Sequence, residues 1–105
     1  MDRGIKILVV DDDKDYNAYL TKFLLDEGYI VKGITKPLDT ISTLEHEKFH
    51  IVILDLKMPH ISGTELLKQI KSKFQNICVI ILTGYPSFNT AVETMKLDAF
   101  DYLKK

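Results

Sequence analysis

The stretch that decides the fold is Ile5-Lys6-Ile7-Leu8-Val9-Val10, which runs directly into Asp11-Asp12-Asp13. A short, nearly continuous apolar run rich in branched side chains is typical of a parallel strand covered on both faces. Carboxylates that follow such a strand lie at its carboxyl end, where open parallel sheets bind their ligands. The stretch therefore predicts an α/β fold with a polar site at one edge of the sheet.

The same alternation of apolar run and amphipathic stretch continues along the chain. Further strands are predicted at Ile51–Leu54 and Ile77–Leu82, with weaker candidates at 29–34 and 100–103. A first helix is marked by apolar residues four, seven and eight positions after the first, and it is ended by a glycine: Tyr16, Leu20, Phe23, Leu24 and then Gly28. Later helices are expected at about 37–48, 62–74 and 87–97. Five strands alternating with four helices predict one doubly wound α/β domain with a five-stranded parallel sheet.

The handedness of the connections predicts how the helices are shared between the two faces of the sheet. In the common strand order 2-1-3-4-5, right-handed crossovers leave the first helix alone on one face and put the other three on the opposite face. One helix cannot cover five strands. We therefore expect residues 1–105 to be a domain shortened before a fifth helix that would follow Lys105, unless a partner chain covers the bare face.

The composition narrows the class of protein without naming a function. The chain has 105 residues, with 14 Lys and Arg against 15 Asp and Glu, so its formal charge is -1 and it has no whole-domain positive field for DNA or an anionic membrane. No apolar stretch approaches the ~20 residues of a membrane helix, and the N-terminus does not resemble a signal peptide. The single cysteine, Cys78, lies in an apolar run and is expected to be a small buried hydrophobe. These features predict a cytoplasmic protein.

The topology brings three carboxylates to one crevice. Asp11 and Asp12 end the first strand and Asp55 ends the third, on either side of the point where the strand order reverses. Three carboxylates in one crevice repel each other unless a cation lies among them, and Mg²⁺ prefers such hard oxygen ligands. Capping of the following helix is the structural alternative, and it is the expected role of Asp13.

An ordered set of motifs extends over the whole chain and resembles the receiver domain of two-component response regulators. The set comprises Val9-Val10-Asp11-Asp12, Leu54-Asp55-Leu56-Lys57-Met58-Pro59, Leu82-Thr83-Gly84 and Asp101-Tyr102-Leu103-Lys104-Lys105. The spacings between the functional positions are also typical of that family. The acidic triplet and the ending of the chain are most similar to regulators of nitrogen-control type.

The resemblance implies a phosphoryl-accepting site. Asp55 would be the phosphoacceptor, and Asp12 would bind Mg²⁺ or Mn²⁺ directly, with Asp11 acting through bound water. The backbone carbonyl of Lys57 would add an oxygen ligand, and Lys105 would neutralise charge on the phosphoryl oxygens. A surface lysine at the end of the chain is the duller alternative for Lys105.

The resemblance also implies a conformational switch and a set of partners. Thr83 would turn toward the phosphoryl group, and Tyr102 would move into the space that it leaves. The phosphoryl donor would be a sensor histidine kinase or a phosphotransfer protein, and the output would pass to an effector domain or a homodimer partner. The domain would be a signalling module, not an enzyme beyond its own phosphorylation and dephosphorylation, and would make no direct nucleic-acid contact.

One departure within the motifs, one hypothesis about the phosphoryl lifetime and three alternatives accompany the resemblance. Asp98 stands where the family usually has glycine, and the bulk of Lys57 and Tyr85 is expected to shield a phosphoryl group from water. A phosphatase with an aspartate nucleophile would need a second acid where this chain has Lys57, and a dinucleotide binder would need a glycine-rich loop after Val10. A receiver-like interaction module that accepts no phosphoryl group is the remaining alternative.

Overall fold

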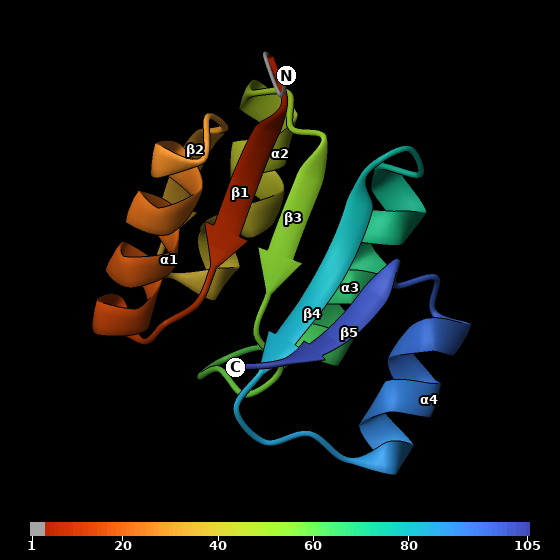
Figure 1. The fold of residues 1–105 in the computed structure, drawn as a ribbon. Coiled ribbons are helices and arrows are strands. Elements are labelled where there is room, and N and C mark those ends of the chain that lie inside the picture. The colour runs from red at the N-terminus through yellow and green to blue at the C-terminus, as the bar shows by residue number, and fades with distance from the viewer. Residues whose placement is uncertain (1–3) are drawn as a thin grey trace.

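The five strands form one parallel sheet in the order β2-β1-β3-β4-β5 in the computed structural model, which describes residues 4–105 (Figure 1). The strands are β1 Lys6–Val10, β2 Ile30–Ile34, β3 Ile51–Leu54, β4 Cys78–Thr83 and β5 Asp101–Lys104. The predicted fold class and strand order are therefore confirmed. The carboxyl ends of the strands lie at one edge, and the C-terminus lies beside the ends of β3 and β4.

The helices connect successive strands, as the alternation predicts. They are α1 Lys14–Asp26, the short 3₁₀ helix η1 Pro37–Asp39, α2 Thr40–His46, α3 Gly63–Lys73 and α4 Phe88–Lys96. None of the helices described within residues 4–105 combines the length and the apolar character needed to cross a membrane.

The predicted helix at 37–48 is two shorter pieces, and the boundaries have physical causes. Pro37 fixes its own φ and lacks an N–H, which suits the first position of η1. The helix α2 ends because Glu47 is extended at φ -145°. Where the chain leaves the helix, the Glu47 carboxylate lies 2.8 Å from the Lys6 ammonium of β1.

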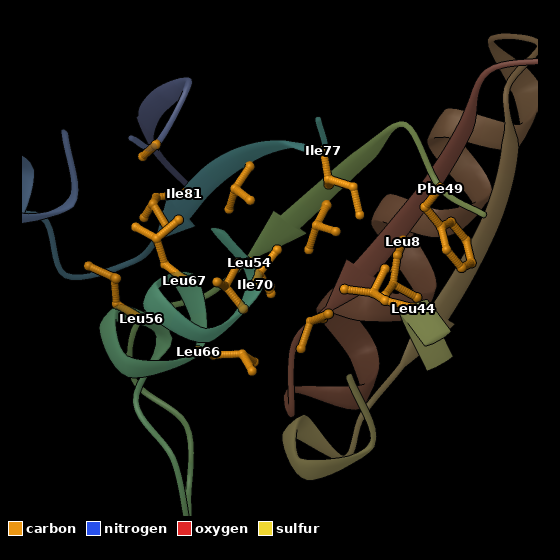
Figure 2. Packing of buried hydrophobic residues seen from close by; sticks show 14 residues of the cluster. Leu8, Leu44, Phe49, Leu54, Leu56, Leu66, Leu67, Ile70, Ile77 and Ile81 are labelled. Atoms are coloured by element: carbon orange, nitrogen blue, oxygen red, sulfur yellow. The ribbon is translucent and has the colours of Figure 1, made fainter. Parts of the chain in front are cut away.

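One face of the sheet carries the hydrophobic core. Alternate strand residues point to this face and are fully buried, among them Leu8, Val52, Leu54, Val79 and Ile81. Helix α3 covers them with Leu66, Leu67 and Ile70, which belong to the same cluster (Figure 2). Leu44 of α2 and Ala99 after α4 extend the cluster along the sheet.

The other face is covered unevenly. Ile7 and Val9 of β1 are buried, whereas Ile53, Ile80 and Leu82 are half-buried and Leu103 is 46% exposed. The prediction that Cys78 is buried is wrong. Cys78 is the first residue of β4, and it is exposed on this face of the sheet. Among the described residues, strands β3 to β5 therefore lack full cover on one side, as the handedness argument predicts.

Helix α1 packs on the sheet through polar groups. Asn17 is its buried residue, and its amide donates to the carbonyls of Asp11 at 3.0 Å and Ile34 at 2.9 Å. A Cβ on Gly33 of β2 would collide with the Asn17 side chain, so this close approach requires glycine. The predicted apolar face is partly wrong: Phe23 is 50% exposed, because Asn17 and not an apolar stripe sets the rotation of the helix.

Candidate functional site

The three predicted carboxylates converge at the ends of two adjacent strands. Val10 of β1 pairs with Leu54 of β3, so the residues that follow, Asp11 and Asp55, lie side by side. One carboxylate oxygen from each of Asp11, Asp12 and Asp55 lies within 4.8 Å of the others. Asp11 and Asp55 are buried and Asp12 is half-buried. The structure thus brings together the acidic groups that the topology predicts.

Lys105 reaches this cluster from the end of β5. Its Nζ lies 2.7 Å from Asp11 Oδ2 and 3.3 Å from Asp55 Oδ2. Its backbone N–H donates to the carbonyl of Thr83 at 2.8 Å, which continues the pairing of β5 with β4. The neighbouring carboxylates fix this terminal lysine, and its side chain is only 18% exposed.

The ionisation of the cluster reflects burial and the neighbouring charges. Burial raises the pKa of Asp55, the negative charge of Asp11 raises it further, and Lys105 and the Leu56 N–H oppose the shift. Burial lowers the pKa of Lys105, but its contacts with Asp11 and Asp55 outweigh burial and raise the pKa overall. The Asp55 carboxyl is therefore harder to ionise than an ordinary aspartate, and the Lys105 ammonium is harder to deprotonate than an ordinary lysine.

The donor set fits a hard divalent cation. Three carboxyl groups against one amine give the cluster a formal charge of -2, and carboxylate oxygens are the ligands that Mg²⁺ and Ca²⁺ prefer. Lys57 lies two residues after Asp55 in the same loop, with an exposed side chain whose Nζ is 4.7 Å from the centre of the Tyr85 ring. The predicted role of its backbone carbonyl stays a prediction.

The loop that carries Asp55 is held from below by the start of α3. The Gly63 N–H donates to the carbonyl of Leu56 at 2.8 Å, and Ser62 caps α3 by accepting from the Glu65 N–H at 3.1 Å. A Cβ at position 63 would collide with the carbonyl oxygen of Asp55. Glycine therefore lets the helix approach the strand end and keeps the carboxylate in place.

The two predicted switch residues, Thr83 and Tyr102, lie on β4 and β5. Thr83 is buried at the end of β4, and its Oγ1 accepts from the Tyr85 N–H at 3.1 Å. The Tyr102 hydroxyl lies 2.6 Å from Thr90 Oγ1 and accepts from the Ser87 N–H at 3.1 Å. The sequence did not point to these last two contacts, although Ser87 was expected at the start of the helix. The connection between Thr83 and Tyr102 runs through the β4–α4 loop.

Tyr16 is a further residue at the site that the sequence placed only on a helix face. Asp13 caps α1 by accepting from the N–H groups of Asp15 and Tyr16, both at 3.1 Å, as expected. This cap puts Tyr16 in the first turn, where the centre of its ring lies 4.5 Å from Lys105 Nζ. Burial raises the pKa of Tyr16, and Lys105 opposes that shift.

Comparison with known proteins agrees with the geometry. The model of the response regulator receiver domain matches residues 7–105. The chain belongs to this family. Among curated relatives, the transcriptional regulatory protein ZraR of Klebsiella oxytoca is 39% identical over 96% of the receiver domain. The DNA-binding transcriptional regulator NtrC of Proteus hauseri is 32% identical over 100% of it.

The relatives are much longer than the receiver domain described here. It spans 23% of the ZraR regulator and 22% of the NtrC regulator, so less than a quarter of either. The match to regulators of this type confirms the predicted nitrogen-control resemblance.

Solved receiver structures share the fold over nearly the whole domain. A response regulator from Burkholderia pseudomallei, with a phosphorylated aspartic acid, calcium ion and citrate, superposes with a TM-score of 0.90 at 30% identity, covering 96% of this domain and 59% of that chain. Response regulator TrrA from Thermotoga maritima, in complex with Mg²⁺ and BeF, gives 0.87 at 30% identity, with coverage of 96% and 86%.

Proposed function

We propose that this receiver domain accepts one phosphoryl group on Asp55 from a sensor histidine kinase or a phosphotransfer protein. The observation that carries the proposal is the position of the buried Asp55 carboxylate at the switch point of the sheet, within 4.8 Å of Asp11 and 3.3 Å from the Lys105 ammonium. The phosphorylated aspartic acid of the Burkholderia pseudomallei regulator supports the same chemistry here.

The two oxygens of Asp55 have different surroundings. Oδ1 accepts from the Leu56 N–H at 2.8 Å, whereas Oδ2 faces Lys105 at 3.3 Å. An ionised carboxylate needs no base: one of its oxygens attacks phosphorus, the bond from phosphorus to the donor breaks, and its electron pair leaves with the donor. Lys105 stabilises the charge that develops on the phosphoryl oxygens.

The acidic cluster would hold Mg²⁺, with Mn²⁺ as the alternative ion. Asp12 and Asp55 would bind it directly, Asp11 through water and Lys57 through its carbonyl, and the ion would neutralise charge on the transferring group. The presence of Mg²⁺ in the Thermotoga maritima complex supports this choice. The work left to the protein is to orient Asp55 and Lys105.

The output would depend on Thr83 and Tyr102. The Thr83 hydroxyl would give up the Tyr85 N–H and bind a phosphoryl oxygen, and Tyr102 would leave Ser87 and Thr90 and turn inward. We also propose that a further helix covers the exposed side of β3 to β5, with an effector domain or a second copy receiving the signal.

The test is treatment with acetyl phosphate and Mg²⁺, followed by intact mass measurement. We expect a gain of one phosphoryl group that is absent in Asp55→Asn. Asp13→Asn is the matched control, because asparagine caps a helix as well as aspartate does and should leave the reaction unchanged. A wild-type chain that gains no mass would favour the receiver-like interaction module instead.

A further inference from the structure

We infer that Tyr16 is a positioning residue that holds the Lys105 ammonium over the crevice through the face of its ring. The inference rests on the proposed function, because the group being positioned is the one that neutralises phosphoryl charge. Its starting point is the 4.5 Å separation between Lys105 Nζ and the centre of the Tyr16 ring, within the ~6 Å range of a cation–π contact.

Lys105 needs a contact of this kind because its ion pairs with the two carboxylates change during the reaction. Its ammonium touches Asp11 and Asp55, and both carboxylates change partners in the reaction. A cation bound among the carboxylates competes with Lys105 for Asp11, and phosphorylation removes the negative charge of the attacking oxygen of Asp55. The Tyr16 ring is neutral and takes part in neither event, so it can hold Lys105 throughout.

The backbone that carries the ring is held by two residues of the acidic triplet, Asp11 and Asp13. Asp13 accepts hydrogen bonds from the first turn of α1, including the Tyr16 N–H at 3.1 Å, and the Asp13 N–H donates to Asp11 Oδ1 at 3.0 Å. The Tyr19 ring lies on the outer side of the same helix, 6.0 Å from the Tyr16 ring. The position of Tyr16 is therefore tied directly to the strand end that carries the site.

The ring face and not the phenol group is the part that matters. The hydrogen bonds found within residues 4–105 include none to the Tyr16 hydroxyl, although the ring is half-buried. Phenylalanine presents a ring of the same size to the ammonium, whereas leucine presents none. This difference separates positioning of a cation from simple packing.

The experiment compares Tyr16→Phe and Tyr16→Leu with the wild-type chain. The first readout is the rate of phosphorylation by acetyl phosphate at fixed Mg²⁺, and the second is the NMR shift of the Lys105 ε-methylene protons, which a nearby ring face moves upfield. We expect Tyr16→Leu to react about three- to thirty-fold more slowly and to lose the upfield shift. Tyr16→Phe should retain both.

Phe23→Leu is the control on the same helix, because Phe23 is 50% exposed and makes no contact with the site that the structure records. It should leave the rate and the shift unchanged, and urea unfolding of every variant checks that it is folded. A Tyr16→Leu rate equal to wild type, or a Tyr16→Phe rate as low as Tyr16→Leu, would overturn the inference. If the wild type takes no phosphoryl group, the proposed function fails, and loss of the upfield shift in Tyr16→Leu still decides whether the ring holds Lys105.

Discussion

The charged half of the site, formed by Asp11, Asp55 and Lys105, differs in its bonding from the neutral half, formed by Thr83, Tyr102 and the start of α4. Ion pairs hold the first half together, from Lys105 to Asp11 at 2.7 Å and to Asp55 at 3.3 Å. Hydroxyl and backbone groups hold the second, each bond contributing about 1 kcal/mol. Full charges resist displacement unless another charge arrives, whereas neutral hydrogen bonds exchange partners easily. The first half is thus suited to chemistry and the second to a change of shape.

Among variants that keep the phosphoacceptor, Lys105→Met should have the largest effect on phosphorylation, because it removes the only cation found within the charged half in residues 4–105. We expect phosphorylation by acetyl phosphate to slow by about 100-fold, as for loss of one group that stabilises transition-state charge. Mg²⁺ should bind more tightly, because Asp11 loses its competing ammonium. Calorimetric titration and a phosphorylation time course measure the two effects.

Lys104→Met is the matched control for this variant. Lys104 is the neighbouring lysine, at the end of β5, and it is exposed to solvent. A Lys105→Met chain that reacts at the rate of Lys104→Met would show that the ion pairs are incidental.

Asp55→Asn should stabilise the fold at neutral pH in the absence of metal, by about 1 kcal/mol, as is common when a strained functional group is removed. The pKa of Asp55 is raised mainly by burial, so the native state prefers the protonated carboxyl. The resulting stabilisation of the native state is fully present below the pKa of the unfolded state, ~3.9. It is lost as the pH rises through the higher pKa of Asp55 in the folded state.

Urea unfolding at several pH values measures this effect. The advantage of Asp55→Asn over wild type should be present at pH 7 and should shrink as the pH falls below the folded pKa. An advantage independent of pH would contradict the assignment to Asp55 ionisation, and saturating Mg²⁺ should reduce it by stabilising the wild type.

Tyr102→Phe tests the neutral half. It removes the hydroxyl that accepts from the Ser87 N–H and contacts Thr90, and should cost about 1 kcal/mol of stability. Amide exchange at the start of α4 should become faster, while phosphorylation should change less than about twofold. Tyr29→Phe is the control, because the described hydrogen bonds include none to the Tyr29 hydroxyl. A large loss of phosphorylation would mean that the halves are not separate.

Lys57→Ala probes the point where the two halves meet, since its ammonium lies over the Tyr85 ring beyond Thr83. Loss of this contact should open the crevice to water. Water then attacks phosphorus, the bond between phosphorus and the Asp55 oxygen breaks, and inorganic phosphate and the Asp55 carboxylate are the products. A contact of this kind at an exposed site is worth about 0.5–1 kcal/mol, so hydrolysis should accelerate about two- to five-fold. The phosphoryl lifetime after removal of acetyl phosphate measures it, with Lys68→Ala on α3 as the control. An unchanged phosphoryl lifetime would show that Lys57 does not shield the phosphoryl group from water.

The carboxylates that sequence reasoning placed correctly share one property: each lies just after the end of a strand. Parallel strands end at one edge, so Asp11, Asp12 and Asp55 had to converge once the strand order was known. The starts of the helices at 63–73 and 88–96 are also predictable from sequence, because serine is a preferred N-cap residue. Ser62 and Ser87 occupy these N-cap positions.

What escaped prediction depends on contacts between distant segments. The spacing of apolar residues placed Tyr16 and Phe23 on one helix face, but Asn17 sets the rotation of α1, and a polar residue carries no weight in such a pattern. Likewise, α2 ends where Glu47 meets Lys6, two residues that lie far apart in the sequence. The link from Tyr102 to Thr90 joins a strand to a helix in the same way.

The exposed thiol of Cys78 gives the molecule a chemical handle that needs no engineering. It is the only cysteine of the chain, and it lies at the opposite end of β4 from Thr83, about 17 Å away for six residues of strand. A maleimide reagent should therefore attach at one place, on the less covered face of the sheet and remote from the acidic cluster. Its rate of attachment then reports how well that face is covered: a helix or partner that packs over β3 to β5 slows labelling, and its departure restores it.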